Sequence, residues 1–332
     1  MHPRPFAILG AGNAATALAL ILSRNGRPVR LWSIEPDVVD DVNRNHRNAK
    51  YLSGVALPAN ISSHGDIGPT LAEAQIVICA VPSHAIVETL RAASEHLAED
   101  AVVASITKGI DETTLAPISV HAAEALPEML QRRLCVIAGP AVANEIAQGH
   151  PAAMVVAGND PEATRLVADA LSGTHVKAAT STDLHGAGYA MALKNAYAIA
   201  LGMCDGLKFP MNTKALVITM ALEEMARILA AAGAQPQTAT SLAGLGDLLV
   251  TGLSPHGRNR TYGERLIGAK SKDPASLGLG TVEGIAATGA ALRLRAKLRV
   301  DTPLLEAVGK CLAQESAFGQ PFVSLIHRLK LD

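Results

Sequence analysis

A glycine-rich turn near the start of the chain most constrains its fold. Residues 6–9 are apolar, Gly10-Ala11-Gly12 follows, and a helix-favouring run, residues 14–22, ends at Asn25-Gly26. This order indicates a strand, a tight turn and a helix. The junction has the form G-x-G-x-x-A, which in this context is typical of a turn that holds the pyrophosphate of a dinucleotide. The sequence therefore predicts that the N-terminal half binds such a cofactor.

Each position of this turn has a physical role. The first glycine permits the turn, the second lets the pyrophosphate approach the backbone, and a small third residue allows close packing of helix on strand. The predicted cofactor contacts here are Gly10, Gly12, Asn13, Ala14 and Ala15.

The acidic residue expected near the end of the second strand is Glu35, which could accept hydrogen bonds from a ribose diol and repel a 2′-phosphate. No arginine stands at Ser33 or Ile34. These residues favour NAD as the cofactor, with NADP as the alternative.

Short apolar runs continue along the first half and alternate with helical stretches, which predicts a parallel, doubly wound α/β sheet. After about Asp183 the pattern changes to long helical stretches rich in Ala, Leu and Met. We therefore expect a dinucleotide-binding Rossmann domain over residues 1–185 and an all-helical substrate domain over residues 186–332. The expected strands cover residues 6–9, 29–32, 76–81, 102–106, 136–138 and 154–157, with a weaker one around Val176.

The overall composition excludes several classes of protein. A net charge of −1 lacks the basic excess of a nucleic-acid binder. The four cysteines have neither metal-ligand spacing nor the density of a disulfide scaffold, so no metal site is expected. The sequence contains no stretch of about 20 uncharged apolar residues, so no membrane-spanning helix is expected. These features predict a cytoplasmic enzyme that binds a small anion.

Lys194 is the strongest candidate for proton transfer. It lies in an apolar helical stretch, residues 191–200, where burial would disfavour the ammonium and lower its pKa toward neutrality. A lysine of this kind can take a proton from an alcohol during oxidation and return it during reduction. The alternative is a surface lysine on an amphipathic helix, which the apolar neighbours on every side disfavour.

Four further residues suit the recognition of an anion. Arg258 and Asn259 place a guanidinium fork beside an amide, a pair well suited to a phosphate, and Thr251 could add a hydroxyl donor. Lys108 follows the expected strand 102–106, at the carboxyl edge where ligands of open α/β sheets lie. It could bind substrate or cofactor, or stabilise negative charge on a carbonyl oxygen. A solvated charged loop is the alternative for both segments.

Several segments, taken in order, make the chain resemble the glycerol-3-phosphate dehydrogenase family. The resemblance spans nearly the whole chain, and the Leu-Lys-Asn and Gly-Arg-Asn-Arg elements with Gly-Leu-Gly-Asp between them are specific in combination. The matching segments are Gly10-Ala11-Gly12, Tyr51-Leu52-Ser53-Gly54, Leu57-Pro58-Ala59-Asn60, Val81-Pro82-Ser83, Thr107-Lys108-Gly109, Gly139-Pro140, Leu193-Lys194-Asn195, Gly244-Leu245-Gly246-Asp247, Gly257-Arg258-Asn259-Arg260 and Val282-Glu283-Gly284.

The resemblance implies a Rossmann domain followed by a helical domain, and the NAD(P)-dependent interconversion of dihydroxyacetone phosphate and sn-glycerol 3-phosphate by hydride transfer. It implies that Asp247 orients Lys194 and that Asn195 belongs to the same catalytic group. It also implies a substrate contact at Gly139, cofactor contacts at Ala143, Glu283 and Arg258, and a homodimer.

Departures from the family pattern keep a second hypothesis open. Ala141 and Gly257 each stand where bacterial members commonly carry serine, Asn13-Ala14-Ala15 replaces a pattern with tryptophan and glycine, and Leu207-Lys208-Phe209-Pro210 is less glycine-rich than expected. A β-hydroxyacid or opine-type dehydrogenase with an altered substrate is therefore the alternative. A regulatory protein that has lost catalysis is disfavoured by the retention of Lys194 and its companions.

Overall fold

The computed structural model describes residues 3–173, 175–255 and 257–328, which form two compact units. The first unit contains the chain up to Lys108 together with Ile118–Leu184. The second contains Gly109–Pro117 and the chain from His185 onward. The segment Gly109–Pro117 thus leaves the first unit and groups with residues that follow it by about seventy positions in the sequence.

The first unit is built on an eight-stranded sheet with the order β10-β9-β8-β7-β6-β1-β2-β5. All seven strands expected from the sequence are present, and β5 is one that the sequence pattern did not indicate. The strands are β1 (Phe6–Leu9), β2 (Val29–Trp32), β5 (Ile61–His64), β6 (Ile76–Cys79), β7 (Val102–Ser105), β8 (Cys135–Ala138), β9 (Ala152–Gly158) and β10 (Val176–Ser181).

The predicted parallel, doubly wound sheet is present, with one antiparallel pair near its edge. The strands from β5 to β8 are parallel, but β9 pairs with β8 antiparallel, with Val136 opposite Ala157, and β10 is parallel to β9. Both β8 and most of β9 are buried. A strand buried on both faces has the same apolar sequence in either direction, so its composition does not reveal which way it runs.

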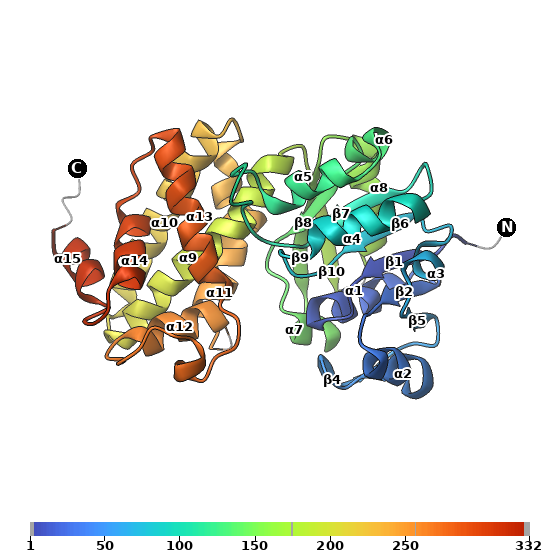
Figure 1. The fold of residues 1–332 in the computed structure, drawn as a ribbon, viewed down its shortest axis with the longest axis horizontal. Helices are drawn as coiled ribbons and strands as arrows, with labels where there is room; N and C mark the ends of the chain where they lie inside the picture. Colours follow the sequence, from blue (N-terminus) through green and yellow to red (C-terminus); the bar gives the residue numbers. More distant parts are fainter. Residues whose placement is uncertain (1–2, 174, 256, 329–332) are drawn as a thin grey trace. The chain divides into compact units, whose positions relative to one another are not determined.

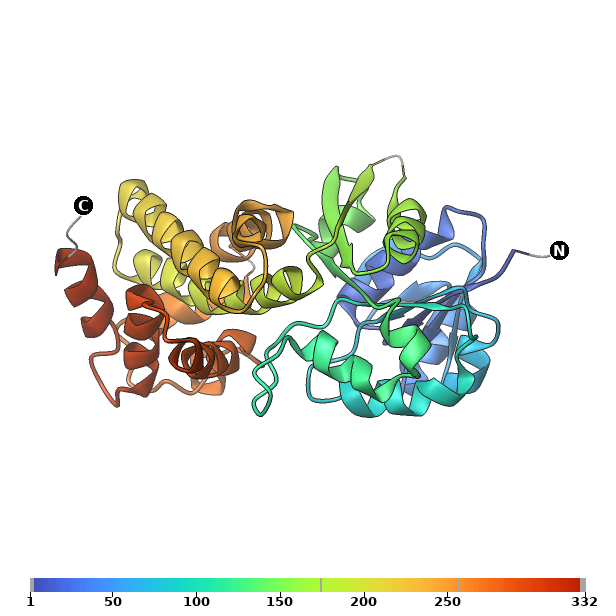
Figure 2. The ribbon, with the colours of Figure 1, turned by 90° about the horizontal axis from the view of Figure 1, so that it is seen from above.

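Helices cover both faces of this sheet (Figure 2). On one face α1 (Asn13–Ser23) contacts α7 (Ala143–Ala147) and α8 (Pro161–Leu171); on the other α3 (Ile67–Leu71) contacts α4 (Ile86–Ala93), which contacts α5 (Ile118–Ala122). The expected helix at residues 14–22 is confirmed as α1. The unit also contains α2 (Pro36–Asn45), α6 (Glu128–Gln131), the 3₁₀ turns η1 (Ser94–His96) and η2 (Ala123–Ala125), and a hairpin of β3 (Arg47–Asn48) with β4 (Leu52–Ala56).

The second unit is helical, as the sequence predicts (Figure 1). Its most buried element is α9 (Leu184–Gly206). Nearly every residue of α9 from Ala187 to Cys204 is buried, on all sides of the helix, which explains its apolar composition. The other elements are α10 (Met211–Ala231), η3 (Pro236–Thr240), the π-helical η4 (Leu242–Gly246), α11 (Asp247–Leu253), α12 (Arg258–Leu266), η5 (Ala275–Leu277), α13 (Glu283–Leu298), α14 (Pro303–Ala313) and α15 (Gln320–Arg328). No helix in the described ranges is long and apolar enough to cross a membrane.

Glycines set how closely α9 and α12 pack. A Cβ on Gly263 of α12 would lie 2.1 Å from the Ile199 carbonyl oxygen of α9. Gly289 of α13 is also helical, but a Cβ there would approach only the end of the Arg293 side chain, at 3.9 Å. We expect Gly263→Ala to destabilise the protein by roughly 1–3 kcal/mol through overpacking. The matched Gly289→Ala should stabilise it by about 0.5–1 kcal/mol, because alanine favours helix. Denaturant unfolding of both variants checks this, and equal effects would contradict it.

Candidate functional site

Two side chains, those of Asp247 and Thr251, contact the amine of the buried Lys194. Its Nζ donates to Asp247 Oδ1 and, at 2.7 Å, to Thr251 Oγ1. The lysine is 2% exposed and the aspartate 4%. A buried ammonium requires a carboxylate partner and further hydrogen bonds, and both are present. Asp247 thus offsets the cost that burial imposes on the Lys194 ammonium.

Local backbone geometry places the two partners of Lys194 side by side. α11 begins at Asp247, directly after the π-helical η4, and Asp247 and Thr251 lie four residues apart on one face of α11. The η4 turn is tight: a Cβ on Gly244 would lie 2.1 Å from the Ala239 carbonyl oxygen. Asp247 is thus the first residue of α11. Its carboxylate contacts Lys194 rather than capping that helix, because Gly246 occupies the N-cap without a side-chain bond.

Asn195, the neighbour of Lys194, belongs to a second hydrogen-bonded chain. Asn259 Nδ2 donates to Asn195 Oδ1 at 3.0 Å, and Asn195 Nδ2 donates to Glu283 Oε2 at 3.3 Å. The backbone N–H of Gly284 donates to Asn259 Oδ1 at 2.9 Å. These bonds tie α9 to the first turns of α12 and α13. The amide nitrogen and the amide oxygen of Asn259 thus each make a hydrogen bond. This suits a role in positioning Asn195 and the start of α13, in addition to the expected contact with a phosphate.

Arg258 is placed differently from its buried neighbour Asn259. It is the first residue of α12, its side chain is 60% exposed, and its guanidinium lies 3.9 Å from Glu283 Oε1. The N-cap of α12 is Gly257, which supplies no side-chain hydrogen bond. An uncapped helix N-terminus with an exposed arginine attracts anions, because the helix dipole and the guanidinium act together. The geometry of this segment fits a phosphate.

In the first unit, the glycine turn fits a dinucleotide. Gly10 has φ +118°, and a Cβ there would lie 2.9 Å from the Ala80 carbonyl oxygen, so only glycine fits. A Cβ on Gly12, by contrast, would meet nothing within 4 Å. Asn13 and Ala14 are exposed and Ala15 is buried, and no side chain caps the N-terminus of α1. The backbone is thus open where a pyrophosphate would approach the helix, which is the arrangement expected from the sequence.

The other candidates of the first unit follow the carboxyl ends of neighbouring strands. Lys108 comes three residues after β7, and Thr107 Oγ1 anchors that segment by donating to the Val81 carbonyl at 2.8 Å. Gly139 directly follows β8 with φ +123°, and Ala143 begins α7. Open α/β sheets bind their ligands at this edge. Among the described residues, no group of three or more His, Cys, Asp or Glu side chains could hold a metal ion.

Sequence reasoning missed the residues that surround Glu35. Lys50 Nζ donates to Glu35 Oε1 at 2.5 Å and to Asp37 Oδ2 at 3.1 Å, and the Tyr51 hydroxyl donates to Glu35 Oε2 at 2.7 Å. The bonds from Lys50 and Tyr51 lower the pKa of the Glu35 carboxyl, so it is ionised at neutral pH. Tyr51 lies in one of the family-like segments, but the hairpin that returns it to Glu35 has no clear sequence signal.

Comparison with known proteins agrees with this geometry. The family model described as "NAD-dependent glycerol-3-phosphate dehydrogenase N-terminus" matches residues 5–164, and the corresponding C-terminal model matches residues 183–321. The chain is 36% identical over 322 residues to a glycerol-3-phosphate dehydrogenase [NAD(P)+] of Anaeromyxobacter sp. (strain K), covering 97% of each chain. It is 39% identical over 307 residues to that of Geobacillus thermodenitrificans, covering 92% of this chain and 89% of the relative.

A solved structure shows the same relationship over the whole length. The glycerol-3-phosphate dehydrogenase of Coxiella burnetii superposes with a TM-score of 0.88 at 32% identity, covering 98% of this chain and 99% of that one. The Plasmodium falciparum enzyme has the same TM-score at 22% identity and shares the fold. Two family models, full-length relatives and the buried lysine site together lead to one conclusion: the chain belongs to the NAD-dependent glycerol-3-phosphate dehydrogenase family.

Proposed function

We propose that this chain interconverts dihydroxyacetone phosphate and sn-glycerol 3-phosphate with NAD(P)(H) as hydride carrier. The observation that carries the proposal is the buried Lys194–Asp247 pair with the half-buried Thr251 beside it, a group suited to proton transfer in a chain of this family. When bound, the nicotinamide supplies the hydride that reduces the carbonyl carbon. The glycine turn at Gly10 and Gly12 and the N-terminus of α1 are the parts of the first unit that would hold the pyrophosphate.

Lys194 provides the proton that this reaction needs. In the reducing direction, the ammonium donates a proton from Nζ to the carbonyl oxygen as negative charge develops there. In the oxidising direction, the neutral amine takes the hydroxyl proton. Asp247 and Thr251 hold Nζ in one place and stabilise its charged form. They act as positioning residues for the lysine.

Phosphate recognition falls to Arg258 and the uncapped N-terminus of α12. The side chain of Arg258 is exposed and can offer two parallel N–H groups to a phosphate. Asn259 holds the first turn of α12 in place through its hydrogen bonds with the Asn195 side chain and the Gly284 backbone. Lys108, Gly139, Ala143 and Glu283 complete the proposed contacts to substrate or cofactor.

The test measures NADH and NADPH oxidation by the purified protein with dihydroxyacetone phosphate and, separately, with unphosphorylated dihydroxyacetone. We expect turnover that depends on the phosphate. Turnover of β-keto acids without any dependence on phosphate would instead favour the β-hydroxyacid alternative, and no turnover with either cofactor would overturn the proposal.

Arg258→Met is expected to raise KM for dihydroxyacetone phosphate by about 10- to 100-fold, because a charge-assisted hydrogen bond contributes about 1.5–3 kcal/mol. Arg258→Lys should have a smaller effect, since it keeps the charge and loses the fork. The matched control is Arg293→Met on α13, where an exposed arginine lies 3.5 Å from Glu112. Steady-state kinetics checks the prediction, and equal KM values for the Arg258→Met and Arg293→Met proteins would contradict it.

A homodimer and a cytoplasmic location complete this proposal. All four cysteines are unpaired and buried, which suits a reducing compartment. Light scattering of the purified chain tests the dimer.

A further inference from the structure

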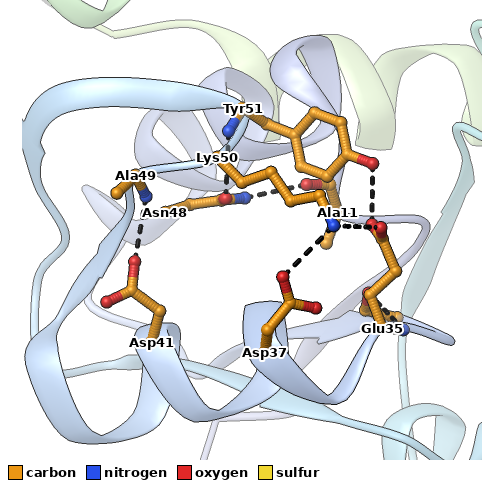
Figure 3. A network of polar contacts seen from close by, with 9 residues as sticks. Ala11, Glu35, Asp37, Asp41, Asn48, Ala49, Lys50 and Tyr51 are labelled. Atoms are coloured by element: carbon orange, nitrogen blue, oxygen red, sulfur yellow. Dashed lines mark hydrogen bonds and ion pairs between the residues drawn. The ribbon is translucent and has the colours of Figure 1, made fainter.

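The hairpin β3–β4 brings Lys50 and Tyr51 next to two carboxylates of the first unit, Glu35 and Asp37. We call these four residues the ribose cluster. Figure 3 shows Lys50 between the two carboxylates and the Tyr51 hydroxyl directed at Glu35. Two carboxylates and one ammonium leave one net negative charge. The ammonium favours the ionised carboxylates, so the pKa of Asp37, like that of Glu35, lies below its usual range.

The ribose cluster is connected to the glycine turn by hydrogen bonds. Asn13, the first residue of α1, donates from Nδ2 to the Tyr51 carbonyl at 2.7 Å. Asn48 Nδ2 donates to the Ala11 carbonyl at 2.8 Å (Figure 3). It also donates to Thr16 Oγ1 at 2.9 Å. Tyr51 therefore links the turn and Glu35 directly: its backbone accepts from Asn13 and its hydroxyl donates to Glu35. The cluster lies beside the place where a dinucleotide's pyrophosphate would be held.

Two further observations point to an adenosine at this position. Glu35 follows β2 by three residues, and β2 neighbours β1, so the cluster stands at the carboxyl edge of the sheet next to the glycine turn. Ile34, the residue before Glu35, is 78% exposed although it is apolar. An exposed apolar side chain beside a fixed carboxylate offers a surface for a purine and an acceptor for a ribose hydroxyl.

Lys50 and Tyr51 fix the orientation of the Glu35 carboxylate without exhausting it. Each carboxylate oxygen accepts one hydrogen bond from the cluster, and each has a further lone pair for a ribose hydroxyl. A 2′-phosphate in the same place would meet two carboxylates, while the Lys50 ammonium is already paired with both of them.

We propose that Lys50 is a specificity-determining residue: with Tyr51 it positions Glu35 for the 2′-hydroxyl of an adenosine ribose, so that the chain selects NAD(H) over NADP(H). This inference rests on the proposed function only in assuming that the chain binds a dinucleotide cofactor; it does not depend on the identity of the three-carbon substrate. Lys50 is a positioning residue in the native chain. When Glu35 loses its charge, Lys50 becomes the cation that a 2′-phosphate can bind.

The experiment measures binding by calorimetry, with no three-carbon substrate present. The probes are ADP-ribose and 2′-phospho-ADP-ribose, and each is titrated into the purified full chain. The native protein should bind ADP-ribose at least 10-fold more tightly. Glu35→Gln should lower that ratio by 10-fold or more, chiefly through tighter binding of the 2′-phosphate. Adding Lys50→Met to Glu35→Gln should abolish the gain, and Lys50→Met alone should weaken ADP-ribose binding several-fold.

Arg44→Met is the matched control. It also removes one positive charge, but from an Arg44–Asp40 ion pair on α2 that lies outside the ribose cluster. It should leave both affinities unchanged. Tighter binding of the 2′-phosphate by the native protein would overturn the inference, as would a gain in Glu35→Gln that persists without Lys50. Binding of neither probe would overturn both this inference and the proposed cofactor. Normal discrimination in a protein that does not turn over dihydroxyacetone phosphate would support the inference and reject only the proposed reaction.

Discussion

Replacing Lys194 with methionine is expected to lower kcat by ~10²–10⁴-fold, the usual contribution of a positioned acid or base. Methionine fills a similar volume in this buried position but lacks the ammonium that, in the proposed reaction, donates the proton. Binding of ADP-ribose should persist, since its proposed contacts lie in the first unit. Stopped-flow measurement of NADH oxidation with saturating dihydroxyacetone phosphate gives the rate.

The same substitution also leaves the Asp247 carboxylate buried without its cation, which costs roughly 3–5 kcal/mol. The double variant Lys194→Met/Asp247→Asn removes that buried charge and should recover part of the lost stability while remaining inactive. Asp247→Asn alone should lower kcat with little change in KM, because Asp247 acts through the lysine. A Lys194→Met protein that retains kcat within tenfold of the native value would refute the assigned role.

Glu224→Ala is expected to destabilise the protein by about 3 kcal/mol or more. Glu224 is fully buried on α10, and its carboxylate accepts from the backbone N–H groups of Leu304 (2.5 Å) and Leu305 (3.0 Å) in the first turn of α14. It also accepts from the Tyr197 hydroxyl of α9 at 3.1 Å. Alanine would leave three buried donors without this acceptor. Urea unfolding followed by far-ultraviolet circular dichroism measures the loss.

The contribution of Glu224 should also depend on pH. Burial raises the pKa of its carboxyl to about 7, and the two backbone N–H bonds and the Tyr197 hydroxyl oppose that rise. Between pH 4.5 and 7 the folded state then binds more protons than the unfolded state, so this group stabilises the fold most below pH 4.5 and loses that contribution as pH rises through 7. The native protein should lose up to roughly 3 kcal/mol relative to Glu224→Gln between pH 5 and pH 8.

Trp32 provides an internal control for these unfolding measurements. It is the only tryptophan in the chain and lies on β2 of the first unit, whereas Glu224 belongs to the second unit. Its fluorescence should report an unfolding transition that Glu224→Gln changes little with pH. A pH-independent difference between the native protein and Glu224→Gln would show that the carboxyl does not titrate in the folded state between pH 5 and pH 8.

The sequence alone determined the features that depend on local pattern. The apolar run before Gly10 and the helix-favouring run after Gly12 are sufficient to define β1, the turn and α1, because a strand, a φ-positive glycine and a helix each have a local signature. The uninterrupted apolar composition around Lys194 indicated that this lysine is buried, and the structure confirms it. Periodicity also separated the α/β half from the helical half.

Tertiary structure decided the features that depend on residues distant in sequence. The partners of Lys194 lie 53 and 57 positions away, and those of Glu224 lie 27 to 81 positions away, so no local signal joins them. The antiparallel direction of β9 was hidden because a buried strand is apolar in either direction. Lys50 meets Glu35 only because the short β3–β4 hairpin folds back beside the glycine turn. Local propensities define where each element begins and ends, but side-chain pairing across elements requires the three-dimensional packing of the whole unit.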